Sequence, residues 1–423
     1  MNNRSAILRF SSWGIPALYA GAALTAGLTF PRIEGHMFPG LVSPLSITAA
    51  TAIYSSIASG MIALTSIVFS LAFVMVQYSA TAYSPRLVSL IARNPVMSHA
   101  LGTFTATFLY AIAALGGIDR SGSGKVPFVS LWLVVALLVA SVAMFISLTQ
   151  RISLLQVSHM LIFTGDQGRN VIETTYSSVK SAGAAVESAD FRELRCTQTL
   201  IHHGKPRSIQ AVDVAALVSL AQTCGGVIEM AVAVGDTAVE SMPLLRVFGA
   251  QQAVDEGELR DAIEIGNERT FEQDPKYAIR LLVDIAIRAL SSAINDPTTA
   301  VQALDQIEDL LLRLGQCHLE SGAYRDIDGK LRLVVPFPAW EDLLRLGLDE
   351  ICSCGATSVQ VMRRTNALIG DLIQYLPEER RPAIRYWAER LNATVTRSFA
   401  EGEERLEASK EDRQGLGLTR RPS

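Results

Sequence analysis

The sequence predicts a multi-pass α-helical membrane protein with four transmembrane helices, followed by a C-terminal cytoplasmic α+β domain. Three observations support this class. The stretch from Met37 to Pro85 contains no Asp, Glu, Lys or Arg, which is typical of a segment that enters a bilayer. The chain has 423 residues, of which 49% are hydrophobic, and is too long for one ordinary domain. Its net charge of −4 combines a basic part, residues 1–150, with an acidic remainder.

Four apolar stretches in the basic part have the length and composition of membrane spans. They cover residues 13–30, 45–77, 99–118 and 126–148 approximately. Because about 20 residues cross the hydrocarbon core, the helix at 45–77 must tilt or extend beyond the bilayer. The first stretch follows two arginines as a signal peptide would, but no small-residue cleavage pattern follows it. We therefore assign it as the first span.

Basic residues in the connecting segments indicate the topology. With the N-terminus inside, the inner segments carry Arg4, Arg9, Arg86, Arg93 and Arg151, and the outer segments carry Arg32, Arg120 and Lys125. Both termini are therefore expected in the cytoplasm. All cysteines lie in the acidic part at scattered spacings, which fits a reducing compartment and does not form paired zinc-ligand motifs. We expect no metal and no cofactor.

A polar stripe follows the second predicted span. At about 100° per residue, its side chains fall on one face of the helix. The stripe consists of Ser55, Ser59, Ser66, Ser70 and Gln77, with Thr48 at its start, and the opposite face carries Ile57, Ile67, Val68, Leu71 and Met75. A shorter polar row on the third span consists of His99, Thr103, Thr107 and Tyr110. Two explanations remain open: close helix packing through small residues, or a water-lined path around the axis of a homo-oligomer.

The remainder of the chain changes character along its length. Residues 151–190 predict a connecting helix and linker, residues 191–272 a β-rich subdomain, and residues 273–400 a helical subdomain. Within the β-rich part, Gly235 and Asp236 predict the turn of a hairpin. Asp274-Pro275 and Asp296-Pro297 have the pattern of helix starts. Residues 401–423 are charged without apolar periodicity, so we expect a disordered tail.

A charged row occurs on the predicted helix after Pro275, where Asp284 lies one turn from both Arg280 and Arg288. The row is explained by a solvated face or a buried brace, by a subunit contact, or by an anion site formed with the N–H groups of the next helix start. The residues proposed for a ligand site or interface are Arg269, Asp274, Arg280, Asp284, Arg288, Asn295, Asp296 and Pro297.

Two stretches carry a resemblance to a known family. They are FSLAFVMVQYSATAYSPRLVSLIARNPVMSHALGTFTATFLYAIAAL and IGNERTFEQDPKYAIRLLVDIAIRALSSAINDPTTAVQALDQI. The chain resembles the bacterial DUF2254 family of predicted membrane proteins. The most specific elements are the loop motif Ser84-Pro85-Arg86 and the INDP motif at residues 294–297. Where the family often has Pro-Gly before INDP, this chain has Ser292-Ala293. The resemblance implies a bacterial inner-membrane location and supplies no reaction, because the family is one of unknown function.

The motif inventory argues against an enzyme. The sequence contains no nucleophile elbow, no HExxH motif, no Walker loop and no dinucleotide fingerprint. Its acidic soluble part argues against nucleic acid, and we expect little charge buried within the membrane part. We expect an integral inner-membrane protein that forms an oligomeric, channel-like assembly gated by its cytoplasmic domain. The alternative is a membrane-anchored sensing or scaffold protein whose cytoplasmic domain binds an anionic ligand or a partner.

Overall fold

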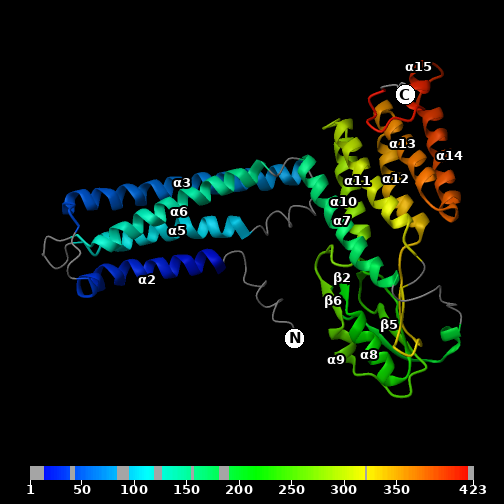
Figure 1. Cartoon of the computed structure of the whole chain (residues 1–423), viewed down its shortest axis with the longest axis horizontal. Coiled ribbons are helices and arrows are strands. Elements are labelled where there is room, and N and C mark those ends of the chain that lie inside the picture. Colours follow the sequence, from blue (N-terminus) through cyan, green and yellow to red (C-terminus); the bar gives the residue numbers. More distant parts are fainter. Residues whose placement is uncertain are drawn as a thin grey trace. The chain divides into compact units, whose positions relative to one another are not determined.

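The computed structural model describes residues 14–38, 43–82, 95–118, 126–153, 157–180, 190–319 and 322–417. The chain forms two compact units, residues 1–156 (unit 1) and residues 157–423 (unit 2). Figure 1 labels the α-helices and some of the strands of these units. Each unit is described by itself below.

The described part of unit 1 is a bundle of four long helices. These are α2 (Gly14–Met37), α3 (Ile47–Ala82), α5 (Pro95–Leu115) and α6 (Phe128–Ser153). Helix α5 packs against the other three, and Tyr54, Phe104 and Tyr110 are among the fully buried side chains between them. Gly27 permits the close approach of α2 to α5, because a Cβ at this position would lie 2.7 Å from the Cβ of Ala113.

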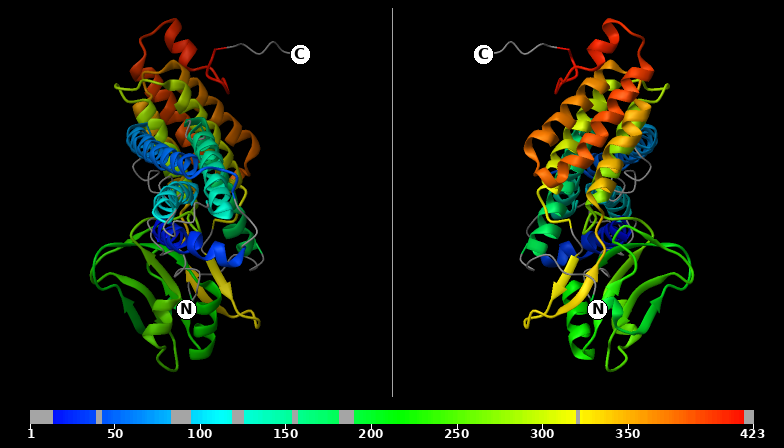
Figure 2. Two further views of the ribbon diagram at one scale, coloured as in Figure 1. Left: turned by 90° about the vertical axis from the view of Figure 1, so that its left-hand side faces the viewer. Right: turned by 90° about the vertical axis from the view of Figure 1, so that its right-hand side faces the viewer.

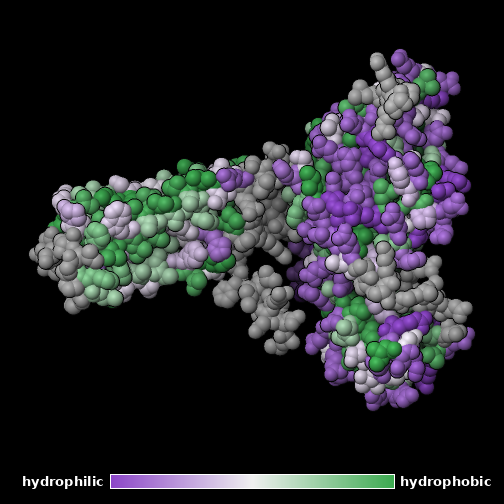
Figure 3. All heavy atoms as spheres, viewed as in Figure 1, coloured by the Kyte–Doolittle hydropathy of each residue, from purple (hydrophilic) through white to green (hydrophobic). Residues whose placement is uncertain are grey.

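Three of the described helices are long and apolar enough to cross a membrane. Their apolar segments are Ile47–Leu71, Val96–Leu115 and Phe128–Gln150. Helix α2, which covers the predicted span at 13–30, is not among them, because Gly, Thr, Tyr and Pro residues make it less apolar than the other three. The predicted number of four spans is therefore not confirmed. The face of unit 1 that Figure 3 shows is largely hydrophobic, as expected for helices that contact lipid.

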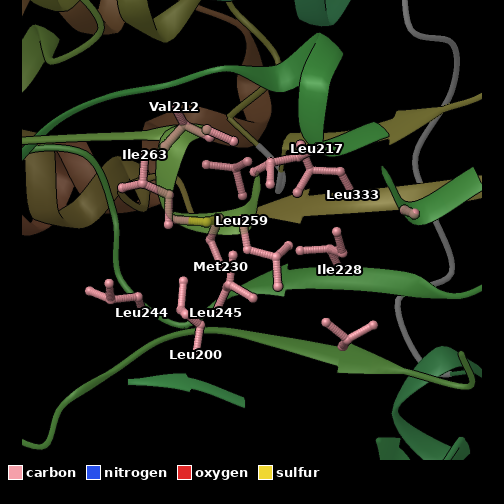
Figure 4. Close-up of a cluster of buried hydrophobic side chains, with 14 of the residues drawn as sticks. Leu200, Val212, Leu217, Ile228, Met230, Leu244, Leu245, Leu259, Ile263 and Leu333 are labelled. Carbon is pink, nitrogen blue, oxygen red and sulfur yellow. The ribbon is translucent and has the colours of Figure 1, made fainter. Parts of the chain in front are cut away.

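The β-rich part of unit 2 contains two sheets. The first has five strands in the order β1-β5-β3-β8-β7, and the second has three in the order β4-β2-β6. The strands are β1 (Cys196–Ile201), β2 (Arg207–Val212), β3 (Val227–Met230), β4 (Thr237–Ala238), β5 (Pro243–Phe248), β6 (Ile263–Gly266), β7 (Gly322–Arg325) and β8 (Leu331–Val335), and the helices in this part are η1 (Asp190–Glu193), α8 (Val214–Cys224) and α9 (Glu256–Asp261). Aliphatic side chains from both sheets and from α8 and α9 form the core shown in Figure 4.

The five-stranded sheet combines segments that the sequence assigned to different subdomains. β7 and β8 come from the predicted helical subdomain, yet β8 pairs in parallel with β3, where Ile228 lies opposite Leu333. These strands, yellow in Figure 2, lie beside the green strands of the β-rich part. The turn at Gly235 and Asp236 does not form the predicted hairpin. It leads from β3 into β4, and β4 pairs with β2 in the other sheet.

Helices form the rest of unit 2. They are α7 (Val157–Lys180), α10 (Pro275–Ala289), α11 (Pro297–Gly315), α12 (Trp340–Cys354), α13 (Val359–Tyr375), η2 (Glu378–Arg380), α14 (Arg381–Ser398) and α15 (Glu403–Ala408). Helix α7, predicted as a connection, packs against both α10 and α11. Gly168 allows this contact, because a Cβ there would lie 2.8 Å from Leu310 and 2.9 Å from Ala278. Helix α7 is therefore part of the unit 2 core.

The two predicted helix starts are confirmed, with Pro275 and Pro297 at the first positions of α10 and α11. Asn295 adopts a left-handed conformation with φ of 50°, and Asp296 accepts a hydrogen bond from the Thr299 N–H. The INDP motif thus forms the turn between α10 and α11 and caps α11, which is a structural role.

The segment after residue 400 is ordered as far as residue 417, so the prediction of a disordered tail is wrong there. Its helix α15 packs against α13 and α14. Arg413 donates to both oxygens of Asp371 on α13, at 2.8 and 2.6 Å. Charged residues that lack local periodicity are held here by partners elsewhere in the fold. Residues 418–423 lie outside the described residues.

Candidate functional site

A cavity of about 250 Å³ lies within unit 2, where the β-rich part meets the first turn of α10. Its walls come from α7, from the end of β2, from the loop before β4, and from the segment after β8. The lining residues include Thr174, Val212, Ala233, Val234, Glu272, Asp274, Lys276, Tyr324 and Phe337. We refer to it as the Asp274 cavity. Most of this lining is apolar, which is typical of small-molecule sites that orient a ligand with a few polar groups.

Asp274 is the most deeply buried ionisable group of this cavity, with 1% of its side chain exposed. Arg269 donates to its Oδ2 through Nε at 2.9 Å and through Nη2 at 2.5 Å. The other carboxylate oxygen, Oδ1, is buried and has no hydrogen-bond partner among the described residues. Burial raises the pKa of Asp274, and the charges of Arg269 and Lys276, together with hydrogen bonding from Arg269 and from the Tyr277 N–H, oppose this rise. An unsatisfied buried acceptor is costly, and such exceptions require an explanation.

The backbone at Gly235 leaves space for the carboxylate of Asp274. Gly235 has a φ of 89°, and a Cβ at this position would lie 2.1 Å from Asp274 Oδ2. Glycine alone fits both conditions. The next residue, Asp236, accepts a hydrogen bond from the Ala233 N–H and lies 3.6 Å from the Lys276 ammonium. The loop before β4 is therefore folded against the charged groups at the start of α10.

Aromatic rings border the same region. Tyr176 of α7 is buried and packs against Phe337, with ring centroids 5.3 Å apart. Its hydroxyl has no hydrogen-bond partner among the described residues, and burial raises the pKa of Tyr176, so that the hydroxyl stays protonated. Arg269 lies over the ring of Tyr277 at 5.3 Å from the centroid. The contact with Tyr277 favours the position in which Arg269 binds Asp274.

The charged row on α10 does not form one site. Arg269 and Asp274 lie at the start of this 15-residue helix, and Asn295 and Asp296 lie beyond its end, about 22 Å away at 1.5 Å per residue. Between them, Arg280 pairs with Asp284 and with Glu350 of α12. This supports the interpretation of the middle of the row as a brace between helices.

The predicted anion site at the start of α11 is occupied by the chain itself. The Thr299 N–H and hydroxyl both donate to Asp296, at 3.2 and 2.6 Å. Pro297 has no N–H to offer. A carboxylate already fills the position that an external anion would take, and it would repel one. Arg288 lies one turn after Asp284 on α10 and is half-buried.

The polar stripe of α3 is exposed on the single chain. Ser55, Ser59, Ser66, Ser70 and Gln77 are all exposed, whereas Ile57 and Val68 of the opposite face are buried in the bundle. Ser66 donates to the carbonyl of Ile62, one turn earlier, at 3.0 Å. The stripe is less polar than predicted, because Ile62 and Phe73 lie on the same face with exposed fractions of 52% and 70%.

The polar row of α5 has a different environment, inside the bundle. His99 meets the hydroxyl of Tyr19 at 3.1 Å, and Thr107 meets Ser141 of α6 at 2.8 Å. Helix packing accounts for this row. The loop motif Ser84-Pro85-Arg86 lies outside the described residues.

Sequence reasoning missed a buried charge in unit 1. Glu34, in the last turn of α2, is 2% exposed and accepts hydrogen bonds from the N–H groups of Val129 (2.5 Å) and Ser130 (2.9 Å) at the start of α6. The Ser130 hydroxyl in turn meets the hydroxyls of Tyr54 and Tyr110 at 3.2 and 2.8 Å. The signal was available: Glu34 is one of very few acidic residues before residue 150.

Among the described residues, no group of three or more His, Cys, Asp and Glu side chains is arranged to hold a metal ion. No disulfide joins the cysteines in the described part of the chain, and Cys224 and Cys352 are buried.

The fold combines several helices long and apolar enough to cross a membrane with an α+β unit on their C-terminal side, which is the class of a predicted membrane protein. The chain belongs to the DUF2254 family, described as predicted membrane proteins, whose sequence model matches residues 9–371. It is similar to proteins described as uncharacterized in Mycobacterium bovis and Mycobacterium tuberculosis. Both are 25% identical over 421 residues, a match that covers 96% of this chain and 80% of each relative. No solved structure matches this chain.

Proposed function

We propose that this protein is a membrane-anchored sensor whose unit 2 binds a small molecule in the Asp274 cavity. The observation that carries the proposal is the cavity itself, about 250 Å³ in volume, whose mostly apolar walls also include the charged residues Glu272, Asp274 and Lys276.

The chain connectivity supports a sensing role over simple storage. Thr174 of α7 contributes to the cavity wall, and α7 begins at Val157, shortly after α6 ends at Ser153. A ligand in the cavity therefore contacts the helix that follows the last apolar helix along the chain. We place unit 2 and both termini on the cytoplasmic side of a bacterial inner membrane, and we propose no enzymatic activity.

Small aromatic probes test whether the cavity binds ligands. Saturation-transfer NMR would be recorded for 2-phenylethanol, phenethylamine and 3-phenylpropionate with the full chain in nanodiscs. We expect at least one probe to bind the wild-type protein, and Ala233→Phe, which fills the cavity, to abolish its binding. Ala393→Phe on the exposed face of α14 is the matched control. Equal binding by all three proteins, or binding by none, would contradict the proposed function.

A second candidate function, an oligomeric channel-like assembly, is favoured by one observation: the stripe on α3 is exposed on the single chain. Polar side chains that face away from a bundle suggest a neighbouring helix or water. Substitutions of Ser66 distinguish these possibilities in liposome flux assays. In a hydrated path, Ser66→Asp would alter cation flux and Ser66→Leu would block it, while both variants would keep the oligomer together. Loss of the oligomer in both variants would instead indicate helix packing.

A further inference from the structure

The first two turns of α7 carry apolar side chains on their outer side. Met160 and Leu161 are buried. The next two residues, Ile162 and Phe163, are 48% and 42% exposed. Phe163 also makes an edge contact with Phe271, with ring centroids 6.5 Å apart, so its ring is supported from within unit 2. A helix at the surface of a soluble domain is apolar mainly on its buried side. This segment is apolar on both sides, which indicates a partner for the outer side.

The outer side of α7 becomes polar further along the helix. Asp166, Asn170 and Glu173 follow at intervals of about one turn, and all three are exposed. The carboxylate of Asp166 lies 2.7 Å from the guanidinium of Arg169. A change from apolar to charged along one side is expected where a helix passes from the surface of a bilayer into water.

The chain itself holds the first turns of α7 close to the membrane. The apolar segment of α6, Phe128–Gln150, has 23 residues and measures about 35 Å at 1.5 Å per residue. Because the hydrocarbon core is about 30 Å thick, this segment can cross it, and the end of α6 at Ser153 then lies at the membrane surface. Helix α7 begins at Val157, so at most about 14 Å of chain separates the two helices. Such a short tether gives even a small apolar surface a high effective concentration at the lipid.

The INDP turn lies at the same end of unit 2 as the start of α7. Arg169 of α7 donates to Asp309 of α11 at 2.8 Å. One turn later, Arg313 of α11 donates to Glu173 of α7 at 3.0 Å. Both pairs are 140 residues apart, so α7 and α11 run in the same direction and begin at the same level. The turn that precedes α11 exposes 46% of Ile294, which adds an apolar side chain to this end of unit 2.

We propose that this end of unit 2 docks on the lipid bilayer, with Ile162 and Phe163 inserted between the headgroups and Ile294 in contact with the same surface. Recognition is apolar, because the carboxylates that follow on α7 are paired with arginines, so zwitterionic lipid is sufficient. Thr174, which lines the Asp274 cavity, lies about 18 Å further along α7 at 1.5 Å per residue. Docking therefore involves the other end of α7 and does not depend on ligand binding in the cavity.

Photo-crosslinking of the full chain in phosphatidylcholine nanodiscs tests the docking. The photoreactive residue p-benzoylphenylalanine would replace Phe163 or, as the matched control, Tyr386, an aromatic residue of α14 that is 59% exposed. Mass spectrometry of the peptides would measure the fraction that carries a lipid. We expect this fraction to be about tenfold or more higher at Phe163, because the tether concentrates that site at the lipid. Equal fractions at the two sites, or crosslinks from Phe163 to unit 1 or to a second copy of the chain in place of lipid, would overturn the proposal.

A pair of substitutions tests whether the apolar side chains anchor this end. In the protein with the probe at Phe163, Ile162→Gln should lower the lipid-bound fraction at least about threefold, because it removes apolar surface from the contact. Ile327→Gln is the control, since Ile327 is 95% exposed in the turn between β7 and β8, and it should leave the fraction unchanged. Equal fractions in the two variants would contradict anchoring by Ile162. Because Phe163 also packs on Phe271, the same probe placed at Ile162 decides the question if the first probe protein folds poorly.

Discussion

Units 1 and 2 each bury a carboxylate almost completely, and the two carboxylates are satisfied in different ways. In unit 1, both carboxylate oxygens of Glu34 accept hydrogen bonds from backbone N–H groups at the start of α6. Asp274 in unit 2 gives one oxygen to Arg269 and leaves the other without a partner among the described residues. A fully satisfied carboxylate at a helix start acts as a structural brace. A half-satisfied one beside a cavity has the character of a binding site.

The largest effect is expected from Glu34→Ala. The substitution leaves the N–H groups of Val129 and Ser130 buried without acceptors, which costs about 4 kcal/mol at about 2 kcal/mol for each group. Unfolding of the purified protein by SDS titration in mixed micelles would measure the loss. Glu34→Gln, which keeps one acceptor oxygen, should lose about half as much. Wild-type stability in Glu34→Ala would show that Glu34 is not a brace.

Gly235→Ala should be the next most damaging change. A Cβ would lie 2.1 Å from Asp274 Oδ2, and the φ of 89° is strained for alanine, so we expect a loss of about 3 kcal/mol. Gly329→Ala is the matched control, because Gly329 has a φ of 76° with no atom within 4 Å of the added Cβ. The free energy of unfolding of Gly329→Ala should fall by only about 1 kcal/mol, which is the cost of a positive φ for alanine without any steric clash. Equal losses in thermal unfolding would show that the fit around Asp274 is loose.

Asp274→Asn should lower the free energy of unfolding by a smaller amount, about 1 kcal/mol. The amide oxygen still accepts from Arg269, and the neutral side chain avoids the cost of burying a charge. Arg269 keeps 28% of its side chain exposed and can reach solvent. Chemical denaturation of the full chain in nanodiscs would test this value. A loss as large as that of Glu34→Ala would place Asp274 in the same class as Glu34 and remove the distinction between brace and site.

The smallest effect concerns pH. Burial raises the pKa of Asp274, so its folded value lies above its unfolded value. Such a group stabilises the folded state below its unfolded pKa, and this contribution is lost as the pH rises through the folded pKa. The wild-type protein should therefore gain stability relative to Asp274→Asn on acidification from pH 7 toward about pH 4, by less than about 1 kcal/mol. Parallel stability curves for the two proteins would show that the carboxyl is not perturbed.

Several features could be predicted because their causes are local. The apolar segments of α3, α5 and α6 follow from composition alone, and the starts of α10 and α11 follow from Asp-Pro pairs. The first span was less secure, because Arg32 and Glu34 continue the same helix as the apolar residues before them. The order in residues 401–417 could not be read from periodicity, because it depends on partners such as Asp371 on another helix.

The candidate site shows the same division. Arg269 and Asp274 were singled out by sequence, but as part of a row along α10 that the structure separates into distinct pairs. The stripe on α3 was found by helical spacing, yet spacing could not show that Phe73 shares its face at high exposure in the folded bundle. Glu34 was overlooked because a lone carboxylate next to a predicted span has no pattern until the start of α6 is placed beside it.

The sequence by itself determined which segments are apolar, where helices begin, and that an acidic part follows a basic part rich in apolar segments, because these properties depend on neighbouring residues and on helical periodicity. Only the tertiary structure decided that β8 completes the sheet beside β3, and that Gly235 makes room for Asp274. It also decided that Asp274 is buried beside a cavity, with one carboxylate oxygen bound by Arg269. These features depend on contacts between residues far apart in the chain, and burial and hydrogen bonding at such contacts are set by packing.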